Sequence, residues 1–200
     1  MRLTLESLKP EALGIFKNLL GSSEFGGCFC AVWTSHGDDW VARCQDQSQP
    51  NFFVTKKNVE EGRHVGYLVY QGVELVGWTG SGPKTDFPFL KTKLASRLSE
   101  FTRDIWSVGC LAIKEPFRGK GLADAIVNAV IDEAKAHGGK ALEAYPTRPF
   151  HEPRVFRGTE KLYRRLGFIE VGAEKDDEYE ILLMRFALTS NKSGLRGKYD

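Results

Sequence analysis

An apolar run, a glycine loop and an amphipathic pattern follow one another between residues 105 and 137. The run at 105–113 has the length and composition of a buried strand. Apolar side chains then recur at helical spacing from about residue 121, and Gly138-Gly139 ends the pattern. The sequence therefore predicts a strand, a tight loop and a helix over 121–137, in this order.

The loop itself has the features of an anion site. The first N–H groups of a helix have no acceptor within the helix, and the helix dipole favours negative charge there. Glycine lets the backbone come close to a bulky anion such as a pyrophosphate, and basic side chains add positive charge. We therefore predict a phosphate-bearing cofactor, the alternative being a tight turn with solvated cations. The candidate cofactor-binding residues of the loop are Arg118, Gly119, Lys120, Gly121, Leu122 and Ala123.

Two well-known glycine loops do not match this one. A P-loop requires Lys and then Ser or Thr after its last glycine, but Leu122 and Ala123 follow Gly121. A dinucleotide fingerprint requires a third glycine, and Asp124 stands at that position. Glu143 lies near the distance expected for the acidic partner of that fingerprint, which is weak evidence by itself.

Composition restricts the class of protein. The 200 residues are 42% hydrophobic, which suits one domain with a sizeable core. The formal net charge of +2 gives no reason to expect nucleic acid or a membrane as a partner. The N-terminal residues lack the apolar core of a signal peptide. Four cysteines are too few for a disulfide scaffold, so we expect a reduced, cytoplasmic protein.

Periodicity and turn residues predict the remaining elements. The expected strands are 3–5, 28–33, 65–70, 73–79, 105–113, 141–145, 168–172 and 179–186. The expected helices are 10–20, 52–61, 89–101 and a short one capped by Thr159, with irregular segments at 38–50, 80–88 and 146–153. Gln71-Gly72 is a hairpin signal. A hairpin-rich first half followed by alternating strands and helices fits an α+β fold with a mixed sheet.

Two motifs resemble those of the GNAT acyltransferase superfamily. The first is Leu111-Ala112-Ile113-Lys114-Glu115-Pro116-Phe117-Arg118-Gly119-Lys120-Gly121-Leu122-Ala123, which is similar to the family's apolar strand and its Arg-Gly-x-Gly loop. The second, about 40 residues later, is Leu162-Tyr163-Arg164-Arg165-Leu166-Gly167-Phe168, which is similar to the family's L-Y-x-x-x-G-F. Both motifs, in this order and at this spacing, make the resemblance specific over about residues 104–173.

The resemblance implies a single-domain α+β fold, with a mixed twisted β-sheet flanked by helices on both faces. The domain is expected to span 1–189, with the cofactor core at about 104–173 and acceptor specificity mainly in 1–100. Residues 190–200 are small and polar, and we expect them to form a flexible tail.

The resemblance also assigns roles. Main-chain groups of Leu111 and Ile113 are expected to pair with the pantetheine arm, as an added strand would, and Ala112 between them is expected to be a cofactor-binding residue. Main-chain N–H groups from Arg118 to Ala123 are expected to hold the pyrophosphate. A strand N–H would stabilise the oxyanion. Tyr163 occupies the position of the general acid, and a phenol stays protonated at neutral pH; the alternative is that Tyr163 only packs in the core.

The second motif departs from the family pattern, and the general base is not identified. Phe156 and Thr159 stand where Asn and Ala are common, which puts the usual Asn contact with the cofactor arm in doubt, and Arg157-Gly158 could shape the loop near the phosphates. The candidate bases are Glu74, Glu143 and His151, each with a surface charge as its alternative.

Other polar and aromatic signals favour packing over a site. Cys28 and Cys30 with His36 lack metal-site spacing, so we expect a buried strand there and no metal. Cys110 is expected to be a core residue. The four tryptophans could pack in the core or line an acceptor pocket; they are Trp33, Trp40, Trp78 and Trp106. Gly80-Ser81-Gly82-Pro83 is expected to form a mobile lip over the acceptor cleft.

The function implied by the resemblance is an acetyl-CoA-dependent N-acetyltransferase. The acetyl group would pass from the thioester directly to a primary amine in a ternary complex. The acceptor would be a small-molecule or peptide amine, and a homodimer is left open. Two other classes stay as alternatives: a non-catalytic acyl-CoA binding module and a Rossmann-like nucleotide-binding domain.

Overall fold

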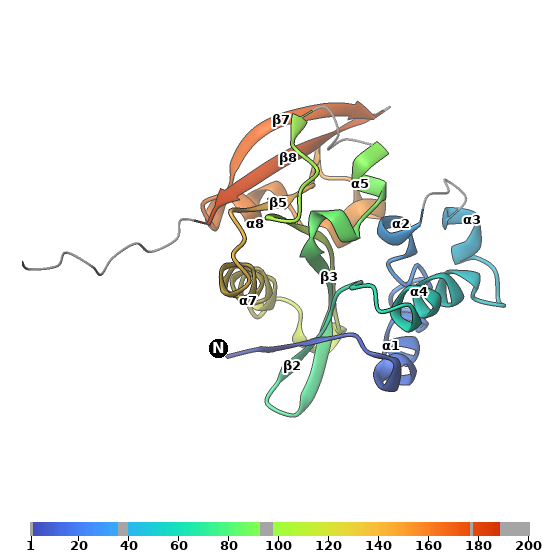
Figure 1. The fold of residues 1–200 in the computed structure, drawn as a ribbon. Helices are drawn as coiled ribbons and strands as arrows, with labels where there is room; N and C mark the ends of the chain where they lie inside the picture. Colours follow the sequence, from blue (N-terminus) through green and yellow to red (C-terminus); the bar gives the residue numbers. More distant parts are fainter. Residues whose placement is uncertain (1, 36–39, 93–97, 177, 189–200) are drawn as a thin grey trace, which may run out of the picture.

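The computed structural model describes residues 2–35, 40–92, 98–176 and 178–188 (Figure 1). Its strands are β1 (Thr4–Ser7), β2 (Tyr67–Gln71), β3 (Glu74–Pro83), β4 (Ile105–Ile113), β5 (Ala141–Ala144), β6 (Thr147–Arg148), β7 (Ile169–Asp176) and β8 (Tyr179–Ala187). Its α-helices are α1 (Leu13–Leu20), α2 (Ala31–Thr34), α3 (Trp40–Cys44), α4 (Pro50–Glu60), α5 (Phe89–Thr92), α7 (Leu122–Ala136) and α8 (Glu160–Arg165). Short 3-10 turns are η1 (Pro10–Ala12), η2 (Lys84–Asp86), η3 (Glu115–Phe117) and η4 (Glu152–Arg157).

All eight strands belong to one mixed sheet. β1, β2, β3 and β4 are antiparallel neighbours, whereas β4 and β5 are parallel. β8 lies between β5 and β7 and is antiparallel to both, and the short β6 also pairs with β8. The sheet is twisted, and its single parallel pair lies at its centre (Figure 1). A Rossmann-like domain needs a mainly parallel sheet, so this topology excludes that alternative.

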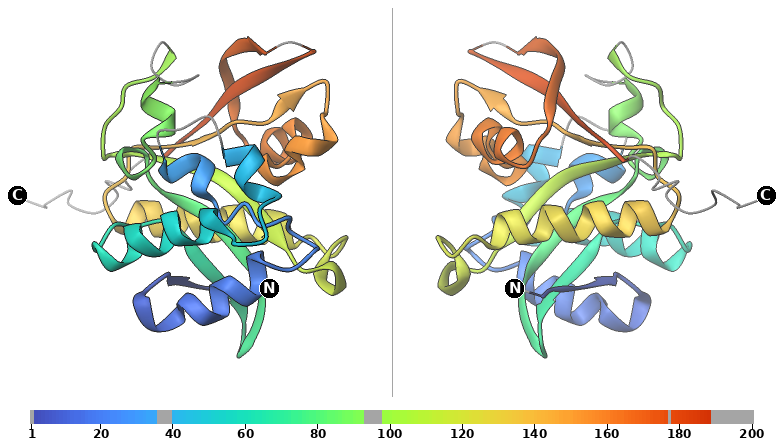
Figure 2. Two further views of the ribbon diagram at one scale, coloured as in Figure 1. Left: turned by 90° about the vertical axis from the view of Figure 1, so that its right-hand side faces the viewer. Right: turned by 90° about the vertical axis from the view of Figure 1, so that its left-hand side faces the viewer.

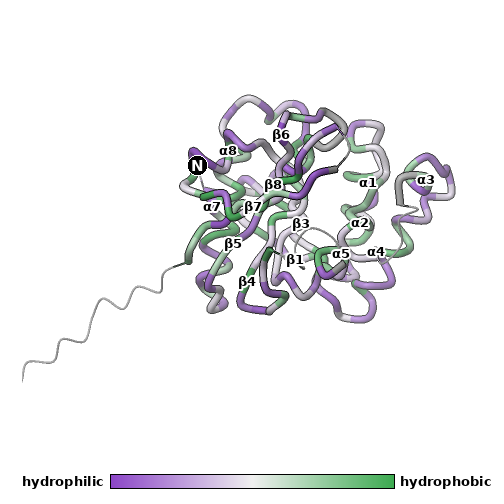
Figure 3. The backbone as a smooth tube through the Cα atoms, turned by 90° about the horizontal axis from the view of Figure 1, so that it is seen from above, coloured by the Kyte–Doolittle hydropathy of each residue, from purple (hydrophilic) through white to green (hydrophobic). Residues whose placement is uncertain are grey.

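Helices cover both faces of the sheet (Figures 1 and 2). One core packs α7 and α8 against β4, β5 and β8. The other packs α1, α2 and α4 against the opposite face, around Trp33 and Trp78. Hydrophilic segments lie mainly at the periphery (Figure 3). The predicted fold class, a mixed sheet with helices on both faces, is confirmed.

The periodic segments fold as predicted. α7 buries the apolar stripe expected of it, including Leu122, Ile126 and Val130. The Thr159 hydroxyl accepts a hydrogen bond from the Leu162 N–H at 3.1 Å and so caps α8. β2 and β3 form the predicted hairpin, and Gly72 supplies the positive φ of 61° in its turn. The predicted tail at 190–200 lies outside the described residues.

The prediction of a strand at 28–33 was wrong. Phe29 and Cys30 have φ of 46° and 56°, and α2 starts directly after them. All residues from Phe29 to Thr34 are buried, so the segment lacks the alternation that separates a strand from a helix. A continuous apolar run indicates burial, but not which backbone conformation is buried.

The prediction of a loop at 80–88 was wrong for residues 80–83, where a mobile lip was expected. β3 continues through Gly80-Ser81-Gly82-Pro83 and pairs with β4 along this stretch. A Cβ on Gly80 would lie 3.0 Å from Cys30 Sγ and 3.2 Å from Cys110 Cβ. Glycine therefore serves close packing here and not a turn. Two expected irregular segments also contain short elements, α3 within 38–50 and β6 within 146–153.

A buried ionic network joins η2, β5 and β8 beneath the α1–α4 face of the sheet. Lys84 Nζ lies 2.8 Å from Glu143 Oε2, and neither side chain is exposed to solvent. Arg185 Nη2 lies 2.6 Å from Glu143 Oε1, and Tyr145 Oη donates to Glu143 Oε2 at 3.2 Å. Ser99 Oγ also donates to this carboxylate at 2.5 Å. One carboxylate therefore accepts hydrogen bonds from η2, from the residue after β5, from β8 and from the segment before β4.

We predict that Glu143→Gln destabilises the protein by about 3–5 kcal/mol, because it leaves the Lys84 ammonium buried without its counter-ion. Urea denaturation followed by circular dichroism measures the change. Glu174→Gln, at an exposed position of β7, is the matched control and should stay within about 0.5 kcal/mol of the wild type. An unchanged unfolding midpoint for Glu143→Gln would contradict this role.

Candidate active site

The pairing between the parallel strands β4 and β5 ends halfway along β4. Their pairing runs from Ile105 with Ala141 to Val108 with Ala144 and then stops. Gly80 pairs with Cys110 and Ser81 with Val108, so Gly109 is an extra residue in β4. Such a bulge bends its strand. β4 thus bends at the point where it leaves β5, and beyond it only β3 pairs with β4.

Beyond the bulge, β4 directs the main-chain groups of alternate residues into the gap, where Ile113 O already accepts a hydrogen bond from Arg118 Nε. The Lys114 N–H donates to Val76 O at 3.0 Å, and hydrogen-bonding direction alternates along an antiparallel pair. Leu111 and Ile113 therefore direct their main-chain groups away from β3, toward the gap. Ala112 directs its groups toward Trp78 of β3. The gap thus presents a strand edge at Leu111 and Ile113, and the pairing of this edge with a cofactor stays a prediction.

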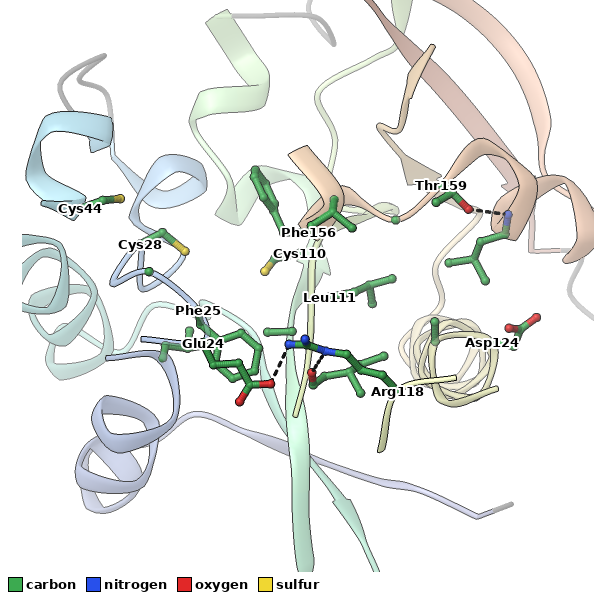
Figure 4. Close-up of a pocket in the computed structure, with 18 of the residues that line it drawn as sticks. Glu24, Phe25, Cys28, Cys44, Cys110, Leu111, Arg118, Asp124, Phe156 and Thr159 are labelled. Carbon is green, nitrogen blue, oxygen red and sulfur yellow. Dashed lines mark hydrogen bonds and ion pairs between the residues drawn. The ribbon is translucent and has the colours of Figure 1, made fainter. Parts of the chain in front are cut away.

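A cavity of about 710 Å³ lies against this edge (Figure 4). One wall is β4 from Cys110 to Ile113, and the facing wall is η4 and α8 with Phe156, Gly158 and Leu162. The loop between α1 and α2 closes a third side, and the first residues of α7 lie at one end. Cys28 and Cys44 line the cavity on the side of the α1–α2 loop (Figure 4).

The glycine loop leads into α7 in a conformation that leaves its amides accessible. Gly119 and Gly121 have φ of 71° and 75°, and a Cβ on either would meet nothing within 4 Å. The first intrahelical bond runs from the Ala125 N–H to Gly121 O at 3.2 Å. The N–H groups of Leu122 and Ala123 therefore have no acceptor within the helix. Ala123 lines the cavity, so this helix end meets the site.

The basic side chains around the glycine loop differ in their ion-pair partners. Arg118 Nη2 lies 2.7 Å from Glu24 Oε1, and Arg118 Nε donates to Ile113 O at 2.8 Å (Figure 4). Arg165 forms a two-point ion pair with Asp124, at 2.8 Å for both bonds. Lys120 is exposed to solvent. Arg118 is thus paired with a carboxylate at the cavity wall.

Tyr163 lies immediately behind the wall of the cavity. Its side chain is fully buried, and its hydroxyl donates to Arg157 O at 2.8 Å. A Cβ on Gly158 would lie 2.8 Å from this hydroxyl, so Tyr163 lies against a glycine that lines the cavity. Burial, and to a lesser degree the nearby Cys110, raise the pKa of the Tyr163 hydroxyl. The phenol is therefore protonated at neutral pH.

The departures from the family pattern lie around the same wall. Phe156 and Thr159 both line the cavity, so an aromatic ring stands where an amide side chain is common. The Arg157 guanidinium is buried and lies 5.2 Å from the Trp33 ring. Arg157 thus packs on the aromatic core beside the cavity.

The three candidate bases are placed apart from the described wall. Glu143 is buried in the ionic network, Glu74 is exposed at the start of β3, and the His151 ring stacks on Tyr179 at 4.6 Å. None of the three is among the described residues that line the cavity.

Several lining residues were missed by the sequence analysis. Glu24 and Cys44 carried no motif signal, since only the fold brings their segments to the cavity, and Arg165 stands at a variable position of the second motif. Cys110 is buried as expected, but it also lines the cavity. Trp33, Trp78 and Trp106 are core residues; the side chain of Trp40 and all of His36 lie outside the described part.

Neither a candidate metal site nor a membrane-spanning helix is found among the described residues. They contain no group of three or more His, Cys, Asp or Glu side chains that could hold a metal ion. Among the helices described, none combines the length and the hydropathy that a bilayer crossing requires.

Comparison with known proteins identifies the family. The model of the acetyltransferase (GNAT) family matches residues 29–168, which is more than half of the chain. The chain belongs to the GNAT family. The matched range includes the cavity walls formed by β4, η4 and α8, the glycine loop of this acetyltransferase and Tyr163. Comparison with curated protein sequences finds no significant match.

Solved acetyltransferases share the fold of this GNAT protein at low sequence identity. AAC(6')-Ib in complex with ribostamycin and coenzyme A has a TM-score of 0.62 and 14% identity, with 94% of each chain covered. The ribosomal-protein-S18-alanine N-acetyltransferase from Escherichia coli has a TM-score of 0.54 and 15% identity, over 97% of this chain and 99% of that one. A mutant of the spermidine N-acetyltransferase from Vibrio cholerae has a TM-score of 0.57 and 14% identity, over 93% and 94%.

The co-substrate of the GNAT family is acetyl-CoA, and the residues of this member fit it. The strand edge at Leu111 and Ile113 suits the amide groups of the pantetheine arm. The free N–H groups of Leu122 and Ala123 suit a pyrophosphate. Both features border the one cavity of about 710 Å³.

Proposed function

We propose that this acetyltransferase moves the acetyl group of acetyl-CoA directly to a primary amine in a ternary complex. The observation that carries the proposal is the unpaired edge of β4 beyond Val108, in the wall of a cavity that ends at α7. A thioester with an extended amide arm and a pyrophosphate is complementary to both features. The domain would span 1–189, with its cofactor core at about 104–173.

The chain would hold the donor mainly through its backbone. Leu111 and Ile113 pair with the pantetheine amides, while the loop from Arg118 to Ala123 supplies N–H groups to the pyrophosphate. Ala112 contributes to the cavity wall. A main-chain N–H on the open side of β4 stabilises the oxyanion that forms when the amine attacks, an effect worth about 3 kcal/mol.

The proposed reaction forms a carbon–nitrogen bond and breaks the carbon–sulfur bond of the thioester. The neutral amine nitrogen attacks the thioester carbonyl carbon, the carbon–sulfur bond breaks, and an amide and a thiolate result. The nitrogen releases one proton to solvent water, and the thiolate takes up one proton to become the thiol. Tyr163 is the proposed donor of that second proton, because its hydroxyl carries a proton at neutral pH and lies against Gly158, which lines the cavity.

Direct transfer is favoured over an acyl-cysteine intermediate by the state of the cavity thiols. Burial raises the pKa of Cys28 to about 12. A hydrogen bond with Cys30, together with burial, raises the pKa of Cys110 well above its usual range. Protonated thiols are poor nucleophiles. The amine of the acceptor is therefore the proposed nucleophile.

The acceptor is proposed to be a small-molecule or peptide amine, recognised mainly by elements within residues 1–100. The similar structures include enzymes named for spermidine, an aminoglycoside and a ribosomal-protein alanine, which are three kinds of amine. Trp33, from this region, packs on the bulge residue Gly109, where a Cβ would come within 2.8 Å of its ring. The cytoplasmic location and the homodimer stay predictions.

We expect coenzyme A and acetyl-CoA to raise the unfolding temperature of the protein, because both bind only the folded chain. NAD should not do so. Acetyl-CoA should then release free thiol, measured by a thiol reagent, with at least one amine among an aminoglycoside, spermidine and an Ala-initiated peptide. Stabilisation without thiol release from a broad amine panel would favour a non-catalytic binding module. Lack of stabilisation by any coenzyme A species would contradict the proposal.

Replacing Tyr163 with Phe should lower kcat on the order of a hundredfold, because it removes the proton donor to the thiolate. The dissociation constant of acetyl-CoA should change little, since the proposed binding groups are main-chain atoms of other residues. Steady-state kinetics and isothermal titration calorimetry measure the two effects. Tyr70→Phe, on β2 and outside the cavity lining, is the control. A variant at 163 with wild-type kcat would remove Tyr163 from the mechanism.

A further inference from the structure

One carboxylate from the acceptor half of the chain contacts the cofactor loop. Glu24 lies in the loop between α1 and α2, about ninety residues before Arg118. Its Oε1 accepts a hydrogen bond from Arg118 Nη2 at 2.7 Å (Figure 4) and another from the Glu115 N–H at 2.6 Å. Both charge-assisted bonds are of the strong class. The contact links the α1–α2 loop to the segment that connects β4 with α7.

The guanidinium of Arg118 is thereby fixed from several directions. Its Nε donates to Ile113 O at 2.8 Å, its Nη2 meets Glu24, and its Cζ lies 5.9 Å from the centre of the Phe25 ring. Arg118, Ile113, Phe25 and Glu24 all line the cavity. The side chain thus lies along the wall and joins the end of β4 to the α1–α2 loop.

The loop that carries Glu24 has its own hydrogen bonds. The Phe25 N–H donates to Ser22 O at 3.1 Å, and the Gly27 N–H donates to Leu20 O at 3.2 Å. Ser22 Oγ donates to Leu19 O at 2.9 Å, which ties the loop to the end of α1. Glu24 is therefore presented by an ordered turn, which lowers the entropic cost of holding its carboxylate on Arg118.

We propose that Glu24 is a positioning residue for acetyl-CoA, and this rests on the proposed function. It neutralises the Arg118 charge and holds that side chain on Ile113 O, so that Arg118 shapes the channel for the donor. The pyrophosphate is then bound by the N–H groups of the glycine loop and not by the Arg118 charge. Glu24 also couples the acceptor half of the chain to the cofactor loop.

Direct binding of the phosphates by Arg118 would change the affinity for coenzyme A in the opposite direction. If Arg118 bound the phosphates through its charge, Glu24 would compete with them for the guanidinium. Removing the Glu24 charge would then tighten the binding of coenzyme A. If Glu24 positions Arg118, removing the charge weakens binding. The direction of the change in affinity therefore decides between the two.

The test is Glu24→Gln, measured by isothermal titration with coenzyme A and by steady-state kinetics. We expect the dissociation constant of coenzyme A and the KM for acetyl-CoA to rise about tenfold, the size expected for one charge-assisted hydrogen bond. kcat at saturating acetyl-CoA should change little. The double variant E24Q/R118Q should bind no more weakly than Arg118→Gln alone, because Glu24 acts through Arg118.

Two controls separate this effect from misfolding and from failure of the proposed function. Glu11→Gln, at an exposed position of η1, should bind coenzyme A as the wild type does, and all variants should keep the wild-type urea midpoint. Wild-type protein that binds no coenzyme A would overturn the proposed function and this inference with it. Wild-type protein that binds it, with Glu24→Gln binding equally or more tightly, would overturn the positioning role alone.

Discussion

The early end of the pairing between β4 and β5 is the constraint on which the site depends. Hydrogen bonds join the two strands only as far as Val108 and Ala144, while β4 continues to Ile113 along β3. The Gly109 bulge bends β4 at this point, and Trp33 packs on the glycine from the α1–α4 face. Main-chain groups inside a protein need partners. An open strand edge inside a cavity is therefore matched to an extended ligand with amide groups of its own.

The two faces of the sheet contribute different parts of the site. The face with α7 and α8 supplies the helix N-terminus and the wall in front of Tyr163. The opposite face supplies the α1–α2 loop, and it carries the buried Lys84–Glu143 pair beneath it. Glu24 and Arg118 connect the two parts across the cavity. This arrangement explains how residues from the two halves of the sequence form one channel.

Local signals in the sequence were sufficient for part of this structure. The amphipathic stripe of α7, the Thr159 cap and the turn at Gly72 each act within a few residues, so they could be predicted. The segment at 28–33 could not, because uninterrupted burial removes the periodicity that distinguishes strand from helix. Gly80 and Gly82 were interpreted as loop residues, although close packing explains them. Glu24 had no local signal, because its role depends on a contact with a residue about ninety positions away.

The central claim is that the open edge of β4 binds the donor as an added strand. Amide hydrogen exchange, followed residue by residue by nuclear magnetic resonance with and without coenzyme A, tests it most directly. We expect coenzyme A to slow exchange at Leu111 and Ile113, on the strand edge, as well as at Leu122 and Ala123, at the start of α7. Slowed exchange at the helix start alone, with Leu111 and Ile113 unchanged, would contradict the claim.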